Sequence, residues 1–151
     1  MKFRWGILLA LILGAVPVWA ALGAPEQSIE ADRQRMAGQV KRTAMPGYTL
    51  HEISAPGGRL VREYVSPSGV VFGVAWEGPA MPDLSTLLGS YFSQFQEALA
   101  GASASAHRRH GPLNIQTGEL VVVSGGHQRA FRGLAYVTGL IPAGLSKDVI
   151  R

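Results

Sequence analysis

The chain has 151 residues, 47% of them hydrophobic, with no cysteine and a formal net charge of +4. Lys2 and Arg4 belong to an N-terminal leader, and the chain after residue 20 carries twelve basic against ten acidic side chains, a net charge of only +2. This balance lacks the dense basic stripe of a nucleic-acid-binding domain, and without disulfides the protein must be stabilised by one packed core.

The first twenty residues have the pattern of a secretory signal peptide. Lys2 and Arg4 precede an uncharged apolar run, Pro17 ends it, and Val18-Trp19-Ala20 is a small-residue cleavage pattern. We therefore predict cleavage after Ala20 and a periplasmic or secreted protein. The alternative is an uncleaved leader that anchors the protein in the inner membrane through residues 5–24, because about 20 apolar residues can span a bilayer.

Residues 21–45 are predicted to form a polar N-terminal segment, ahead of a single α+β domain over residues 46–151. A helix is expected from about Glu26 to Lys41. The apolar side chains on one side of this helix are Ile29, Met36 and Val40. Because this stripe is thin, we expect the helix to pack loosely on the domain, with docking to a partner as the alternative.

From Gly47 onward, runs rich in β-branched and aromatic residues alternate with turn-forming Pro and Gly, which predicts three antiparallel strands. These strands are Tyr48–Ile53, Leu60–Val65 and Val70–Trp76. If Val65 pairs with Val70, one face of the sheet should be the core side. Its members would be Val61, Glu63, Val65, Phe72, Val74 and Trp76.

The clearest helical pattern covers residues 84–99, with Asp83 as its N-cap and Gly101 at its end. Its apolar stripe consists of Leu84, Leu87, Leu88, Tyr91, Phe92, Phe95 and Leu99. We expect this stripe to pack against Phe72 and Trp76, because an amphipathic helix buries its apolar side on a neighbouring element.

The remainder of the chain predicts a loop over residues 101–112 and three further extended segments, with Gly125-Gly126 as the turn between the last two. These segments are Leu113–Gln116, Leu120–Ser124 and Ala130–Val137, followed by an irregular tail over residues 141–151. The predicted fold class is therefore α+β, an antiparallel meander of about five strands with one amphipathic helix packed on one face.

Several of these motifs in combination resemble the exported proteobacterial proteins grouped as domain of unknown function 2844. The motifs are Ala21-Leu22-Gly23, Val61-Arg62-Glu63-Tyr64, residues 69–79 (GVVFGVAWEGP), Pro82-Asp83-Leu84, residues 87–92 (LLGSYF), Ser124-Gly125-Gly126-His127 and Ala130-Phe131. The resemblance covers nearly all of the chain after the leader. It implies export and a shared fold, and it supplies no catalytic or binding residue.

The histidines are the first candidates for chemistry. His107 and His110 flank two arginines, His127 follows a double glycine, and His51 lies on the first predicted strand. A structural zinc site needs about four nitrogen or sulfur ligands, and two guanidinium groups repel a dication, so we expect a solvated basic loop rather than a metal site. No cofactor is predicted.

Ser124-Gly125-Gly126-His127 could place a nucleophile near a base. The segment lacks an orienting acid, and the chain contains no Gly-x-Ser-x-Gly elbow, so a tight glycine turn is the expected interpretation and a hydrolase is the third and weakest functional hypothesis.

Two further groups on the predicted sheet are candidates for a site. Glu63 would point inward, where a buried carboxylate must be paired or protonated; the alternatives are a register slip or a structural ion pair. Leu60, Tyr64 and Val71 would form an apolar strip on the second face, covered either by the N-terminal helix or by a partner.

We therefore expect a non-enzymatic binding module that recognises an envelope protein or another envelope component through its sheet face, with no nucleic-acid partner and no membrane contact apart from an uncleaved leader. The alternative is a carrier for a small ligand, held in an aromatic-lined pocket between sheet and helix. Trp76 would be the only tryptophan left after cleavage.

Overall fold

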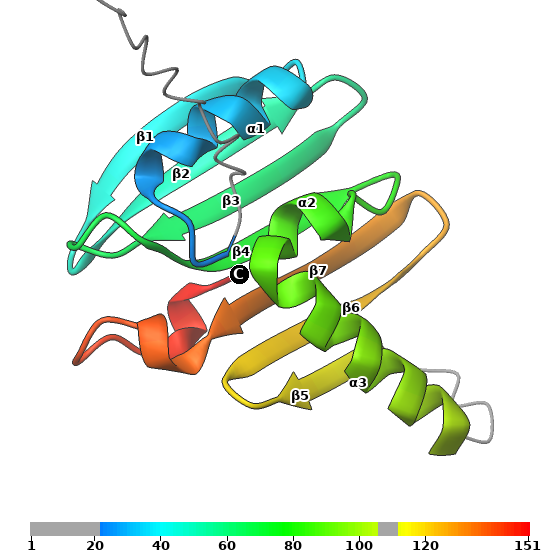
Figure 1. Cartoon of the computed structure of the whole chain (residues 1–151). Coiled ribbons are helices and arrows are strands. Elements are labelled where there is room, and N and C mark those ends of the chain that lie inside the picture. Colours follow the sequence, from blue (N-terminus) through cyan, green and yellow to red (C-terminus); the bar gives the residue numbers. More distant parts are fainter. Residues whose placement is uncertain (1–21, 106–111) are drawn as a thin grey trace, which may run out of the picture.

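The computed structural model describes residues 22–105 and 112–151, which form one antiparallel sheet of seven strands in the order β1-β2-β3-β4-β7-β6-β5. Figure 1 shows the helices lying over one face of this sheet. The strands are β1 (Gln39–Met45), β2 (Tyr48–Ala55), β3 (Arg59–Val65), β4 (Val71–Gly78), β5 (Leu113–Thr117), β6 (Leu120–His127) and β7 (Ala130–Val137). The α+β class is thus confirmed, and the predicted number of strands is too low. The predicted leader lies outside the described residues.

The N-terminal segment contributes a strand that the sequence did not predict. A 3-10 turn, η1 (Glu26–Ser28), leads into α1 (Ile29–Arg35), and the helix predicted to reach Lys41 stops there because Ala37 takes a left-handed φ of 49°. At Gly38 a Cβ would lie 2.8 Å from Ile53 Cγ2, so the close approach of β2 requires glycine. The chain then pairs along the whole of β2 as β1.

A helical segment lies where residues 84–99 predict one, but it is not a single continuous helix. It consists of α2 (Leu84–Leu88), the 3-10 turn η2 (Gly89–Tyr91) and α3 (Phe92–Ser105). The break falls at Gly89, whose φ is 51°. Asp83 is the N-cap as predicted, with its Oδ1 accepting a hydrogen bond from the Ser85 backbone N–H at 3.0 Å. Gly101 does not end the helix, and the rest of the predicted loop lies outside the described residues.

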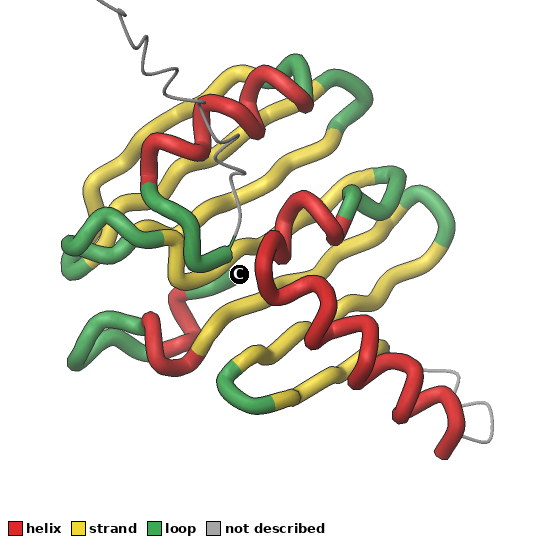
Figure 2. The backbone as a smooth tube through the Cα atoms, viewed as in Figure 1, coloured by secondary structure: helices red, strands yellow, loops and turns green. Residues whose placement is uncertain are grey.

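All three helices cover the same face of the sheet, α1 over β1–β3 and α2 with α3 over β4–β7 (Figure 2). Leu87, Leu88 and Phe95 of the predicted apolar stripe are buried in this layer, and its other members are partly buried around them. Leu22 also belongs to this core, and its backbone N–H donates to the Leu87 carbonyl at 3.0 Å. The expected helix-on-sheet contact is therefore the main core of the protein.

A β-bulge corrects the predicted face of the meander. Val65 pairs with Val71 rather than Val70, and the register shifts between Tyr64 and Val65. The extra residue turns Phe72 to the opposite face, where it packs with Tyr64, while Val71 turns to the helix-covered face. The predicted contact between the helix and Phe72 is therefore wrong, and that between the helix and the Trp76 face is right.

The second face of the sheet is covered by the C-terminal segment. This segment has no strand and contains two 3-10 turns, η3 (Thr138–Leu140) and η4 (Lys147–Val149). Ile150 packs against Tyr64 and Phe72, and the Tyr64 hydroxyl donates to the Arg151 carbonyl at 2.8 Å while accepting from the Arg151 backbone N–H at 3.0 Å. The predicted tail is thus a folded cover.

Candidate functional site

The predicted interaction strip does not form an exposed surface. Tyr64 is buried beneath the C-terminal segment, and Val71 is buried on the other face of the sheet. Leu60 is half-buried at the start of β3, where it lines a pocket. The cover over Tyr64 comes from the same chain, as in one of the two expected alternatives, although the C-terminal segment supplies it rather than the N-terminal helix.

Ser124 and His127 of the Ser-Gly-Gly-His motif have different surroundings and different partners. Ser124 is buried, and its hydroxyl donates to the sulfur of Met81 at 3.8 Å. His127 is exposed at the end of β6, where its Nδ1 lies 3.3 Å from the Gln128 carbonyl oxygen. The hairpin turn falls at Gln128-Arg129, and Gly126 lies within β6, paired with Phe131. Its position requires glycine, because a Cβ there would lie 2.1 Å from the Ala130 carbonyl oxygen. The predicted Gly125-Gly126 turn is therefore wrong.

The remaining histidines do not assemble a site in the described chain. His107 and His110 lie outside the described residues. His51 is buried, and its Nε2 lies 2.9 Å from Glu26 Oε1, an oxygen that also accepts from Arg42 Nε at 3.0 Å. Among the residues that the structure describes, no group of three or more His, Asp or Glu side chains is arranged to hold a metal ion.

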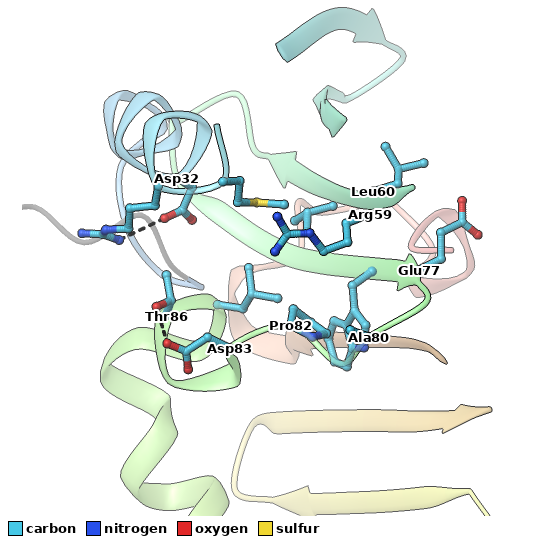
Figure 3. A pocket seen from close by; sticks show the side chains of 13 residues that line it. Asp32, Arg59, Leu60, Glu77, Ala80, Pro82, Asp83 and Thr86 are labelled. Atoms are coloured by element: carbon cyan, nitrogen blue, oxygen red, sulfur yellow. Dashed lines mark hydrogen bonds and ion pairs between the residues drawn. The ribbon is translucent and has the colours of Figure 1, made fainter. Parts of the chain in front are cut away.

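The most distinctive cavity lies between α1 and α2, above the sheet, with a volume of about 260 Å³. Its floor includes Val61 and Trp76, and Met36 and Leu87 contribute to its apolar walls. Asp32 points into this pocket from α1, and Arg59 extends from the start of β3 toward α1, whereas Leu60 and Glu77 point away (Figure 3). The pocket thus has an apolar floor, with the Asp32–Arg35 ion pair of α1 on one side and Arg59 of β3 on the other.

Asp32 of α1 pairs with a second buried carboxyl group, Glu63 of β3, which does not line the pocket; each is only 1% exposed. Asp32 Oδ1 accepts from Arg35 Nη1 at 3.1 Å. Asp32 Oδ2 and both oxygens of Glu63 receive no N–H or hydroxyl donor. Since the two carboxyl groups bond to each other, one proton shared between them must supply the missing donor.

Burial has the largest effect on the pKa values of this pair. Removal from water raises the pKa of Asp32 to about 6, against the opposing effect of Glu63 and Arg35. Removal from water, with the Asp32 carboxyl beside it, raises the pKa of Glu63 well above its usual range. Burial therefore favours a form of the pair in which the two carboxyl groups hold one proton between them, with Arg35 beside Asp32.

Sequence reasoning placed Glu63 inward and missed its partner. Asp32 lies 31 positions earlier, among charged residues of a short helix, where an acidic side chain ordinarily faces water. The signal that could have identified it is position: Asp32 follows Ile29 by three residues, so both occupy one side of the helix. The indole Nε1 of Trp76, also without a partner, is a third buried polar group of this region.

No helix in the described parts of the chain is long and apolar enough to cross a membrane. No curated protein and no solved structure matches the chain. Residues 18–150 match the family described as "Protein of unknown function (DUF2844)", in agreement with the resemblance that the motifs indicate. Because this match spans most of the chain and all of its described elements, the protein belongs to the DUF2844 family.

Proposed function

We propose that this protein is an exported, non-enzymatic binding protein of the cell envelope that carries a small ligand in the pocket between α1, α2 and the sheet. The observation that supports it is the pocket itself, in which an apolar floor that includes Val61 and Trp76 meets a few charged side chains, among them Asp32, Arg35 and Arg59. Ligand sites combine apolar walls with a few placed polar groups in this way. The burial of Tyr64 and Val71 disfavours recognition through the sheet face.

The size of the pocket limits the ligand. Sites for drug-sized molecules have volumes of roughly 300–1,000 Å³. At about 260 Å³, this pocket suits a compound of metabolite size and excludes a folded partner or a long lipid chain. The envelope component recognised is therefore a small molecule or a small terminal group.

Trp76 fluorescence tests the carrier function, since the ring lines the pocket and is the only tryptophan after residue 20. Protein recovered from the envelope fraction would be titrated with small acids, amines, amino acids and sugars, with calorimetry in parallel. We expect a saturable change with one class. Thr86→Phe, which fills the pocket from α2, should abolish it, and Ser93→Phe, on the exposed side of α3, should not. Equal binding by both variants would place the ligand elsewhere.

Export has its own test. Mass measurement and N-terminal sequencing of the protein from the envelope fraction should give a chain that begins at Ala21. A chain that keeps residues 1–20 and sediments with the inner membrane would support the anchored alternative.

A further inference from the structure

The charged side chains around the pocket between α1 and α2 decide which ligand charge fits there. Three acidic residues line the pocket, Asp32, Glu77 and Asp83, together with two arginines, Arg35 and Arg59. A charged group that already has a partner gains little from a ligand, whereas one with unused hydrogen-bonding capacity gains a charge-assisted contact. The partners of these five side chains therefore indicate the class of ligand.

The α1 side of the pocket is electrically compensated. Asp32 is only 1% exposed, and its Oδ1 accepts from Arg35 Nη1 at 3.1 Å. Its second partner, Glu63, does not line the pocket. When Asp32 and Glu63 hold one proton between them, the single negative charge of the pair is balanced by Arg35. This side therefore presents a ligand with an ion pair rather than with an unpaired carboxylate.

The other two acidic residues also have partners within the protein. Glu77 points away from the pocket (Figure 3), and its Oε1 accepts from Arg62 Nη2 at 2.9 Å. Asp83 is the N-cap of α2, where its Oδ1 accepts from the Ser85 backbone N–H at 3.0 Å and its Oδ2 from the Thr86 hydroxyl at 3.1 Å. The acidic lining therefore serves the fold, and it offers little to a cation.

Arg59 differs from these side chains, because most of its donors remain available. It is exposed at the start of β3, and its Nε donates to the Pro56 carbonyl oxygen at 3.3 Å. Within residues 22–105 and 112–151, its two terminal nitrogens have no hydrogen-bond or ion-pair partner. The side chain extends toward α1 at the pocket (Figure 3). The paired N–H groups of a guanidinium match the two oxygens of a carboxylate, so Arg59 favours an anionic ligand.

Apolar side chains dominate the rest of the lining. Val61 and Trp76 belong to the floor, and Met36 and Leu87 belong to the walls. Each methyl or methylene group that a ligand buries against them strengthens binding about fourfold. With a volume of about 260 Å³, the pocket suits a compact apolar body rather than a long chain.

We propose that the pocket binds a small monocarboxylic acid with a compact apolar body, with its carboxylate at Arg59 and its body over Val61 and Trp76. This inference rests on the proposed carrier function and specifies its ligand. An amine would bring a second cation to Arg59, and a neutral compound would forgo the charge-assisted contact. The ammonium group of a zwitterion would find no unpaired carboxylate on the α1 side.

Four compounds separate the contributions of the charge and of the apolar body. 4-Methylpentanoate carries both, 4-methylpentanamide and 4-methylpentylamine replace the carboxylate by a neutral or cationic group, and acetate lacks the body. Calorimetry and Trp76 fluorescence at pH 7.5 should show 4-methylpentanoate binding at least tenfold more tightly than the amide and at least 100-fold more tightly than the amine. Acetate should bind at least 30-fold more weakly than 4-methylpentanoate, because it buries four fewer carbon atoms.

Substitutions of Arg59 test its contact with the carboxylate. Arg59→Gln should weaken 4-methylpentanoate about tenfold and leave 4-methylpentanamide unchanged, so the amide also reports that the pocket of this variant is intact. Arg59→Lys, which keeps the charge and loses the paired N–H groups, should weaken 4-methylpentanoate only about threefold. The matched control is Arg129→Gln, an exposed arginine outside the pocket, which should bind as the wild type does. Equal affinity for 4-methylpentanoate in Arg59→Gln and Arg129→Gln would overturn the assignment of Arg59.

The outcomes separate this inference from the carrier function. If the amide, the amine or a compound of another class binds as tightly as 4-methylpentanoate, and Thr86→Phe removes that binding, the carrier function holds and the monocarboxylate inference is overturned. If none of the tested classes binds in a way that Thr86→Phe abolishes, both fail.

Discussion

Asp32 of α1 and Glu63 of β3 place two carboxyl groups in contact inside the protein, each 1% exposed. The contact joins the N-terminal helix to the centre of the sheet through a proton rather than through opposite charges. Its strength must therefore depend on pH, because ionisation of both groups would bring two negative charges together without water.

The first prediction concerns this dependence. The pKa of Asp32 is raised from 3.8 to about 6, and that of Glu63 is raised well above 4.5. Because the pKa values are higher in the folded than in the unfolded protein, the pair stabilises the fold fully below the unfolded-state pKa values near 4. This stabilisation is lost as the pH rises through the folded-state pKa values. We expect the contribution of this pair to the free energy of unfolding to fall by at least ~2 kcal/mol between pH 4 and pH 7.

Urea unfolding at several pH values measures this slope. Glu63→Gln should flatten it, because the neutral amide no longer titrates, and the exposed Glu97→Gln should leave it as in the wild type. A stability that rises steadily from pH 4 to pH 7 would contradict the shared proton.

The second prediction concerns the proposed pocket. Thr86→Phe fills the pocket from α2 and should abolish the saturable change in Trp76 fluorescence, whereas Ser93→Phe, on the exposed side of α3, should keep it. Titration of both variants with the compound that binds the wild type tests this, and a retained change in Thr86→Phe would contradict it.

The third prediction concerns the C-terminal cover. Tyr64→Phe removes the hydroxyl that serves both backbone groups of Arg151, at 2.8 and 3.0 Å. We expect a loss of about 1–2 kcal/mol in the free energy of unfolding, since two backbone groups lose a partner. Tyr136→Phe, on the same face, is the control, because the hydroxyl of Tyr136 makes no hydrogen bond to another described residue. Equal losses in the two variants would show that the Arg151 contact contributes nothing.

The fourth prediction uses two glycines in different surroundings. At Gly133 a Cβ would lie 2.3 Å from Trp76 Cζ2 and 2.7 Å from the Val123 carbonyl oxygen. Gly133→Ala should therefore destabilise the protein by about 1–3 kcal/mol and shift the Trp76 emission. Gly101→Ala, on α3, adds a Cβ that meets no atom within 4 Å and should stabilise the protein by up to about 1 kcal/mol. Thermal unfolding of both variants gives the comparison, and the same sign in both would contradict it.

The parts of the fold that could be predicted are the helices and strands whose apolar residues recur at a regular spacing. The stripe that ends in Leu99 and the alternation from Val61 to Trp76 reflect burial on one side, and burial leaves a pattern in sequence. β1 leaves none, because an edge strand exposed on both sides, with Lys41 and Arg42 in its middle, has no apolar face to display.

The parts that could not be predicted depend on distant contacts. The bulge that turns Phe72 away is a single extra residue, which a period of two cannot show. The pocket requires α1 and α2 to lie over one sheet, and Asp32 meets Glu63 only when α1 packs on that sheet. The sequence identified Glu63 as an inward-facing carboxyl group. It could not predict the protonation of that group, because it does not show which side chain will face it.

Leu22 is packed in the core only two residues after Ala20, the predicted last residue of the leader, and the Gly23 N–H is bonded to the Val71 carbonyl at 2.8 Å. A peptidase must hold several residues on both sides of the scissile bond in an extended form. Leu22 cannot occupy its place against Leu87 and lie in a protease cleft at the same moment. The predicted cleavage after Ala20 would therefore have to precede the final closure of the hydrophobic interior.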